Sequence, residues 1–254
     1  MSKVFVNIPV HNHLKSAEEC IAAVVDSCVY ADLDFTMVVV DDNSDAETVK
    51  GLIELNNIYA AHMVLLHTKL KTNNPSPNLG LAVNMGLDAF QYSGCDYFWN
   101  VESDVYPEPS CLVELIAGLK DSPDAGMVCP LFIDPEKKRI RHAYPGPDGQ
   151  ALAGQFIEAA PTHNLQVNWQ HMGCNLVPAE IAKDPQCRVD ESFKLWCCDF
   201  DWAWCVEDVF HKKLYYVGKA QAVHIGGMSS SSVDHDNEHQ ENIRVRQKWN
   251  RMHL

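Results

Sequence analysis

Short runs of apolar residues alternate with amphipathic segments through the first half of the chain. Each run is four to six residues long and ends at polar residues or at proline, which is typical of strands buried on both faces. The segments between the runs carry apolar residues three and four positions apart, which predicts helices. The predicted strands are residues 4–8, 35–40, 63–66 and 97–101. The predicted helices cover residues 17–28, 79–90 and 109–119, and a further helix is predicted to follow Ser44.

Polar residues that can cap a helix stand ahead of three of these helices. Ser16 with Glu19, and Ser44 with Glu47, have the spacing of a capping box, in which the serine accepts the first free N–H groups. Asn78 is also a favourable N-cap. We therefore expect the two serines and Asn78 to begin their helices.

Strands that are separated by helices of this length predict right-handed βαβ units and a parallel sheet. The expected fold class is therefore α/β, with a central, mostly parallel sheet flanked by helices. Ligands of such folds bind beyond the carboxyl ends of the strands. Polar clusters occur at three such ends, residues 9–12, 41–44 and 102–104.

The second half has a less regular pattern. Residues 134–170 are rich in proline, glycine and polar residues and give only ambiguous strand signals. No linker or internal repeat divides the chain, so we expect one continuous domain over residues 1–254. The further predicted strands are residues 127–132, 174–177, 214–217 and 222–224, and the further helices are residues 199–212 and 241–249.

Composition narrows the class of protein. A chain of 254 residues with 46% hydrophobic content can fill a sizeable core. The net charge of −14 argues against a nucleic-acid partner. We expect neither a secretory signal nor a membrane span. The ten cysteines are scattered through apolar runs without a CxxC motif, so we expect reduced thiols and a cytoplasmic protein.

Two carboxylates, Glu102 and Asp104, follow the strand at residues 97–101. Side chains at positions i and i+2 of a strand leave on the same side, so both acids are expected to face one crevice. Carboxylate oxygens are the ligands that hard divalent cations prefer. An acidic strand-to-loop turn without any ligand is the plainer interpretation.

Asp42 and the glycines after Asn78 each allow two interpretations. Asp42 could form a polar turn, or it could accept hydrogen bonds from a base or a ribose. Gly80 and Gly86 each cost a helix about 1 kcal/mol relative to alanine, which indicates close approach of a ligand or another backbone. No dinucleotide-binding or Walker glycine motif is present.

Three later residues are candidates for chemistry. Asp199 and Asp201 lie about 200° apart on the predicted helix, so they cannot serve the same purpose. Either could be a favourable acid at a helix N-terminus, or one could be a general base. His224 ends an apolar strand, where it could be structural or could bind a transition metal.

Taken in order, these segments resemble the inverting GT-A glycosyltransferases of family 2. The resemblance covers most of residues 3–132 and 171–229, and the order of the motifs makes it specific. The motifs are an apolar strand with Pro9 and Asn12, the VVDDNS run with Asp42, the segment from Asn78 to Gly86, the Glu102-Ser103-Asp104 triplet, Asp190-Glu191 followed by Asp199, and His224 with Gly226.

The resemblance implies a metal-dependent inverting transferase that moves a sugar from a nucleotide-diphosphate donor to an acceptor hydroxyl. In this family the donor is expected to be a UDP-sugar. The resemblance also implies Mn²⁺ or Mg²⁺ as cofactor, residues 1–132 as the nucleotide-binding half and residues 133–254 as the acceptor-binding half with a C-terminal tail. The acceptor, whether a glycan, a lipid-linked or a protein-linked molecule, stays open. The implied roles are Asp199 as catalytic base; Pro9, Asn12, Asp42, Asn78, Gly80, Glu102 and Asp104 in donor binding; Asp104 and His224 at the metal; and Asp201 and Trp202 in acceptor contact.

Two other functions remain alternatives. A sugar-phosphate nucleotidyltransferase acts on similar ligands, but it normally has a glycine-rich basic loop after the first strand, and residues 10–15 are not such a loop. The other alternative is a non-catalytic relative that binds nucleotide sugars or carbohydrates. The presence of Asp104, Asp199 and His224 together argues against it.

Overall fold

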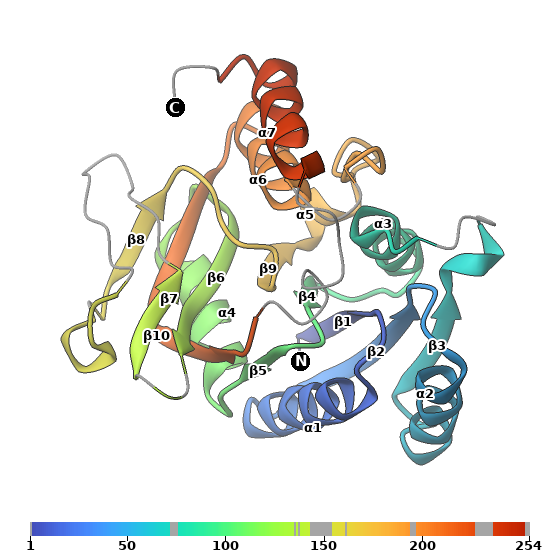
Figure 1. Ribbon diagram of the computed structural model, residues 1–254. Helices are drawn as coiled ribbons and strands as arrows, with labels where there is room; N and C mark the ends of the chain where they lie inside the picture. The colour runs from blue at the N-terminus through green and yellow to red at the C-terminus, as the bar shows by residue number, and fades with distance from the viewer. Residues whose placement is uncertain are drawn as a thin grey trace.

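The computed structural model shows a central sheet with helices on both faces (Figure 1). It describes residues 2–71, 76–134, 136, 138–142, 154–160, 162–193, 197–226 and 236–251.

The first half forms the predicted alternation of strands and helices. β1 pairs with β2 and β4, and β2 pairs with β3, all in parallel. This confirms the parallel arrangement expected for these four strands. The elements are β1 (Lys3–Val10), α1 (Leu14–Tyr30), β2 (Asp34–Asp41), α2 (Ala46–Ile58), β3 (Met63–His67), the 3-10 helix η1 (Thr68–Leu70), α3 (Leu79–Phe90) and β4 (Tyr97–Val101).

The second half extends the same sheet with strands of both directions. Its elements are β5 (Val105–Pro107), α4 (Cys111–Asp121), β6 (Ala125–Asp134), β7 (Arg139–His142), the 3-10 helix η2 (Ile157–Ala159), β8 (Asn164–Val167), β9 (Cys174–Pro178), α5 (Ala179–Ala182), α6 (Cys198–Asp208), β10 (Lys213–His224) and α7 (Asp236–Lys248).

The strand order is β3-β2-β1-β4-β9-β6-β10-β5, with β7 beside β6 and β8 beside β10. β9 runs antiparallel to both of its neighbours, while β10 is parallel to β6. The α/β class is confirmed, but the whole sheet is mixed. All the strands that precede the polar clusters therefore end at one edge, and β9 begins there.

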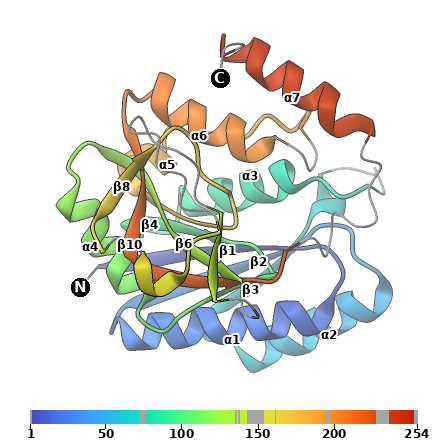
Figure 2. The ribbon, with the colours of Figure 1, turned by 60° about the vertical axis from the view of Figure 1, so that its left-hand side comes forward.

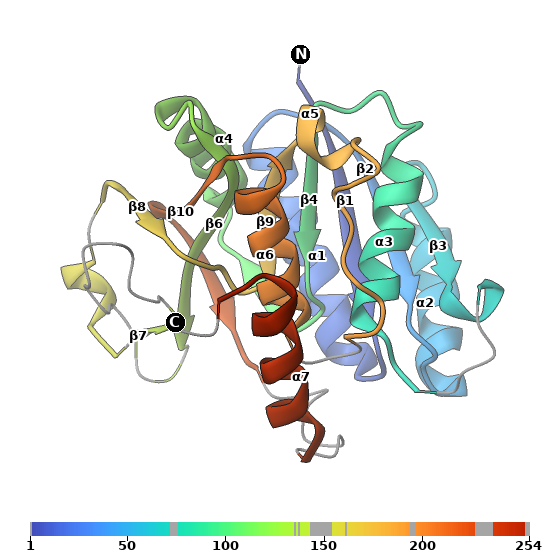
Figure 3. The same cartoon turned by 90° about the horizontal axis from the view of Figure 1, so that it is seen from above.

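The helices form two layers. α1, α2 and α4 cover one face of the sheet, while α3, α5 and α6 cover the other (Figure 3). α7 lies outside α6 and is the outermost helix of its layer (Figure 2). Among the helices that the structure describes, none combines the length and the apolar composition needed to cross a membrane.

Two predicted helix starts were wrong, because the serines serve tertiary contacts. α1 begins after His13, and the hydroxyl of Ser16 donates a hydrogen bond to Ser103 O at 2.9 Å. α2 is capped by Asp45, whose carboxylate accepts from Thr48 N at 2.8 Å, and Ser44 precedes this cap. Asn78 does cap α3, as predicted.

The bounds of other helices and strands also differ from those predicted. The two short strands predicted at residues 214–217 and 222–224 form one strand, β10, with an irregularity between Val217 and Gln221. The helix predicted from residue 109 begins at Cys111, and the helix predicted to reach residue 212 ends at Asp208. All ten cysteines are buried, and the structure forms no disulfide bond between them.

Candidate active site

The first polar cluster lies where β1 and β2 end, and Asp42 is at its centre. Asp42 is only 4% exposed, and its Oδ2 accepts a hydrogen bond from the backbone N–H of Asn78 at 2.6 Å. Its backbone oxygen lies 2.7 Å from Nδ1 of His11, and Nε2 of that ring lies 3.1 Å from the Asn12 amide nitrogen. The carbonyl can only accept and the amide NH₂ can only donate, so this network assigns the His11 proton to Nδ1.

Asn12 and Pro9 lie in the same cluster. Asn12 has a left-handed backbone with φ 58°, its N–H donates to Ser44 Oγ at 2.9 Å, and its Oδ1 accepts from Asp45 N at 2.8 Å. Pro9 on β1 is paired with Val40 on β2. It lies beyond Asn7, the last residue of β1 that is paired with β4. That these residues share a nucleotide pocket with Asp42 stays a prediction.

Burial raises the pKa of Asp42 to about 6, although the hydrogen bond from Asn78 and the nearby His11 act in the opposite direction. A carboxylate that is desolvated in this way gains more from a new hydrogen-bond donor than an exposed carboxylate does. Asp42 is therefore suited to accept a polar N–H group of a ligand.

Asn78 and Gly80 connect this cluster to the segment before α6. The Asn78 side chain caps α3 by accepting from Leu81 N at 3.0 Å, and it donates to Glu191 O at 2.9 Å. A Cβ at Gly80 would lie 3.1 Å from Val189 and 3.3 Å from Phe193 O. The close approach predicted for this glycine therefore involves the protein's own backbone. At Gly86 a Cβ would overlap the side chain of Asn7 on β1, so this close approach involves a side chain and neither a ligand nor another backbone.

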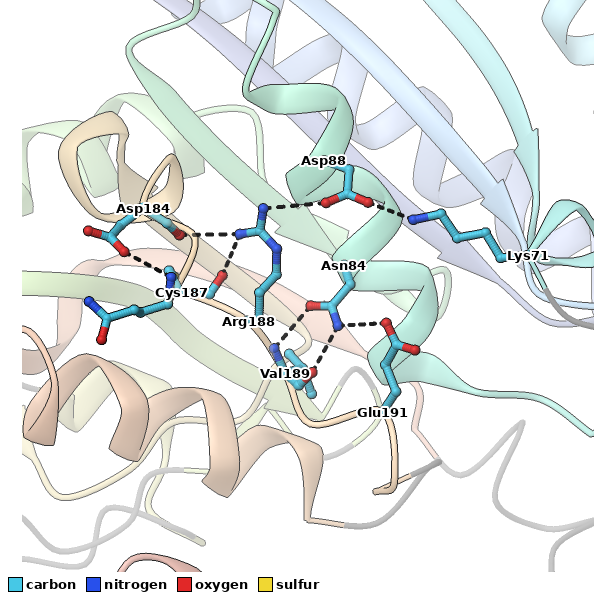
Figure 4. A network of polar contacts seen from close by, with 9 residues as sticks. Lys71, Asn84, Asp88, Asp184, Cys187, Arg188, Val189 and Glu191 are labelled. Carbon is cyan, nitrogen blue, oxygen red and sulfur yellow. Dashed lines mark hydrogen bonds and ion pairs between the residues drawn. The ribbon is translucent and has the colours of Figure 1, made fainter.

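Figure 4 shows how α3 holds the segment at residues 184–191. The Asn84 amide accepts from Val189 N at 3.0 Å and donates to Val189 O at 2.8 Å and to Glu191 Oε1 at 3.0 Å. One turn further along α3, Asp88 lies between Arg188 at 3.3 Å and Lys71 at 2.6 Å. These contacts fix the segment that leads from β9 toward α6.

The second cluster surrounds the acidic turn after β4. Glu102 N donates to Gly173 O at 2.8 Å, which attaches the turn to the start of β9. Ile225 N donates to Asp104 O at 3.1 Å, which attaches it to the end of β10. The side chains of Asp104 and His224 approach to 3.7 Å between Oδ2 and Nε2. The structure thus brings together the two residues assigned to a metal from the sequence.

His171 belongs to this cluster and was missed in the sequence analysis. Candidate ligand atoms of Glu102, His171 and His224 all lie within 4.8 Å of one another. His171 precedes β9, and the direction of β9 decides at which edge of the sheet it lies. The sequence showed a short strand at residues 174–177 but not that it runs antiparallel to β4, which places its first residues beside Glu102.

This cluster fits a divalent cation. It offers carboxylate oxygens from Glu102 and Asp104 and an imidazole nitrogen from His224, a donor set that suits Mn²⁺ and also accommodates Mg²⁺. Burial, followed by the charges of Asp104 and Asp199, raises the pKa of Glu102 well above its ordinary value. Carboxylates placed so closely repel one another, and a cation would relieve that repulsion.

Asp199 lies in the first turn of α6, within electrostatic reach of Glu102. Its Oδ1 accepts from Phe200 N at 2.8 Å, and the helix begins after Cys197, which has a left-handed backbone with φ 64°. Burial raises the pKa of Asp199 to about 6. A carboxyl group with this pKa is suited to take up a proton near neutral pH.

Asp201 and Trp202 are directed into the interior. Asp201 is fully buried, and its carboxylate contacts Lys248, Trp249 and the backbone of Asp190. Trp202 is 1% exposed and donates from Nε1 to the Cys187 sulfur at 3.4 Å. Their expected contact with an acceptor is therefore not supported, because neither side chain has a surface on which an acceptor could rest.

Comparison with solved structures shows which folds are similar. A crystal structure of GalNAc-T7 with UDP, GalNAc and Mn²⁺ matches with a TM-score of 0.68 and 14% identity, over 97% of this chain and 48% of that chain. S. aureus TarS 1–349 in complex with UDP-GlcNAc matches with a TM-score of 0.62 and 14% identity, over 98% of this chain and 66% of that chain. These likenesses show a GT-A fold.

The chain spans about half to two thirds of the length of these structures. Comparison with curated protein sequences gave no match. The sequence does match the family model described as Glycosyl transferase family 2 over residues 5–175, a segment that includes Asp42, Glu102, Asp104 and His171. The chain therefore belongs to glycosyltransferase family 2.

Proposed function

We propose that this protein transfers a sugar from a UDP-sugar to an acceptor hydroxyl with inversion at the anomeric carbon. The observation that carries the proposal is the convergence of Glu102, Asp104, His224 and Asp199 at the edge of the sheet where Asp42 also lies. Family membership supports the reaction class.

The first cluster would bind the nucleoside. Asp42 accepts a polar N–H of the base, and the rigid turn through Pro9 and Asn12 forms the wall beside it. Asn78 and Gly80 support this pocket indirectly, since their contacts are with Asp42 and with the segment before α6. TarS was crystallised with UDP-GlcNAc and GalNAc-T7 with UDP, and these complexes of similar folds support a uridine donor.

The second cluster would hold Mn²⁺ or Mg²⁺ through Glu102, Asp104 and His224. The bound ion supplies positive charge that stabilises the departing diphosphate. GalNAc-T7 was crystallised with Mn²⁺ as well as UDP, which supports this assignment for a similar fold.

Asp199 would take the proton of the acceptor hydroxyl. It lies at the start of α6, beside the acidic cluster, and in this proposal it faces the donor from the acceptor side. A single displacement that is assisted by one base inverts the anomeric centre. In this proposal residues 1–132 bind the nucleotide, and residues 133–254 contribute the base and the acceptor side.

Turnover of a panel of nucleotide sugars tests the proposal. The purified protein should hydrolyse at least one UDP-sugar slowly without acceptor, and EDTA should abolish the reaction. Formation of a UDP-sugar from UTP and a sugar 1-phosphate would instead identify a nucleotidyltransferase. Binding of UDP-sugars without any turnover, also with a range of glycan acceptors, would identify a non-catalytic relative.

A further inference from the structure

The imidazole of His171 is held in one orientation by the chain around it. Gly173 N donates a hydrogen bond to His171 Nδ1 at 3.0 Å. A Cβ on Gly173 would lie 2.8 Å from that nitrogen, so only glycine leaves room for the ring in this position. Phe132 contacts the ring edge-on, with centroids 5.5 Å apart, and the same phenylalanine contacts His224.

This orientation determines which nitrogen carries the proton. Nδ1 must offer its lone pair because it accepts the N–H of Gly173, so the neutral ring carries its hydrogen on Nε2. A histidine that binds a metal has the reverse arrangement at its second nitrogen, which usually donates to a carbonyl or a carboxylate. Of the two ring nitrogens of His171, Nε2 is therefore the one that can donate, although the distances alone would admit the ring as a ligand.

The charges around His171 indicate which group of a ligand its N–H would bind. The nearby acids Glu102, Asp104 and Asp199 are all negative when ionised. A diphosphate that enters this site adds further negative charge, and the residues named in the cluster around Glu102 include no lysine or arginine. A fixed N–H group beside the cation would therefore stabilise phosphate oxygens without competing for the ion.

We propose that His171 donates a hydrogen bond from Nε2–H to the diphosphate of the donor nucleotide and is not a metal ligand. The inference rests on the proposed function, since it requires a nucleoside diphosphate at this site. Gly173 is then a positioning residue, because it provides the space and the N–H that orient the ring.

Calorimetry of the whole protein with Mn²⁺ alone, and then with UDP at saturating Mn²⁺, separates the two roles. His171→Leu should keep the Mn²⁺ affinity within about twofold of the native protein, whereas UDP affinity should fall about 10- to 100-fold, as for a lost hydrogen bond to a charged group. His224→Leu should instead weaken Mn²⁺ binding itself. His239→Leu, an exposed position on α7, serves as the matched control and should change neither affinity.

Gly173→Ala provides a second variant that keeps the histidine but displaces its ring. It should lower UDP affinity by a larger factor than Mn²⁺ affinity. The inference is overturned if His171→Leu loses Mn²⁺ as His224→Leu does, or if UDP affinity is unchanged in both His171→Leu and Gly173→Ala. Failure of the native protein to bind UDP with Mn²⁺ would overturn the proposed function first, and that result appears before any variant is made.

Discussion

The ammonium nitrogen of Lys248 lies 2.7 Å from a carboxylate oxygen of Asp201, whose side chain is fully buried in the first turn of α6. The same carboxylate accepts from Trp249 Nε1 and from Asp190 N, each at 2.8 Å. One buried charge thus joins α7, α6 and the segment before α6. Asp199 is two residues away, so this junction also positions the proposed base.

Lys248→Ala should lower the free energy of unfolding by about 1.5–3 kcal/mol, because it removes a charged hydrogen-bond partner from a buried carboxylate. Urea unfolding measures the change. Lys248→Arg should restore most of the loss. Lys50→Ala removes an exposed pair with Glu54 and should change the stability by less than about 0.5 kcal/mol; an equal effect of Lys50→Ala and Lys248→Ala would contradict the argument.

Asn84→Ala should destabilise the protein by about 2–3 kcal/mol, since it leaves the N–H and C=O of Val189 without their side-chain partner in a buried site. The segment before α6 should then exchange its amide hydrogens faster, which hydrogen–deuterium exchange measures by peptide. Asn57→Ala on the exposed side of α2 is the matched control. Unchanged exchange over residues 186–193 in Asn84→Ala would show that α3 does not hold this segment.

The first four strands could be predicted because their apolar runs and intervening helices are local patterns. The failures came from residues whose partners lie far along the chain. Ser16 has the spacing of a helix cap, but its hydroxyl contacts Ser103 O and the Tyr106 hydroxyl. A local motif cannot show that a better partner arrives from another element.

The sequence indicated the acidic residues of the candidate site, but it did not indicate how all of its residues are arranged in space. Asp42 and Asp104 follow strands, and His224 is the last residue of β10, so the ends of apolar runs mark all three. Asp199 lies in the first turn of α6. His171 was missed because its place depends on the direction of β9 in the sheet. The assignment of Asp201 failed for a similar reason, since its partners on α7 are distant in sequence.

Asp104→Asn should lower Mn²⁺ affinity by about tenfold or more, because the variant loses a charged oxygen ligand. Calorimetry with Mn²⁺ alone provides the measurement. EDTA should then reduce UDP affinity less in the variant than in the native protein. Asp121→Asn, on the exposed end of α4, controls for the loss of one negative charge. If the native protein binds UDP equally well in EDTA, the cation has no part in donor binding.

UDP affinity should decrease as the pH falls below about 6, since the folded-state pKa of Asp42 is raised to about 6 by burial. Protonation converts the acceptor of the base N–H into a carboxylic acid, so each pH unit below this pKa reduces the binding-competent fraction by up to about tenfold. Titrations from pH 5 to 8 measure this, and pyrophosphate controls for protonation of the phosphates. Asp42→Asn should lower UDP affinity and flatten its pH dependence; a steep dependence that persists in the variant would assign the titration to another group.

Asp199→Asn and Asp201→Asn should change stability in opposite directions. Burial raises the pKa of Asp199 from 3.8 to about 6, so the folded protein binds more protons than the unfolded chain between these values. The ionised side chain therefore opposes folding above about pH 6, and this penalty disappears below about pH 4. In EDTA, Asp199→Asn should raise the free energy of unfolding by about 1–3 kcal/mol at pH 7 and should leave it unchanged at pH 4.

Asp201→Asn should lower the free energy of unfolding by about 1.5–3 kcal/mol at pH 7, because its carboxylate is paired with Lys248 and accepts from Trp249.

Sugar-transfer activity should also distinguish Asp199 from Asp201. Asp199→Asn should keep UDP affinity while sugar transfer falls about 10²- to 10⁴-fold, as expected when a general base is lost. An active Asp199→Asn together with a folded but inactive Asp201→Asn would reverse the assignment of the base, and a product with retained anomeric configuration would exclude a single displacement by either residue.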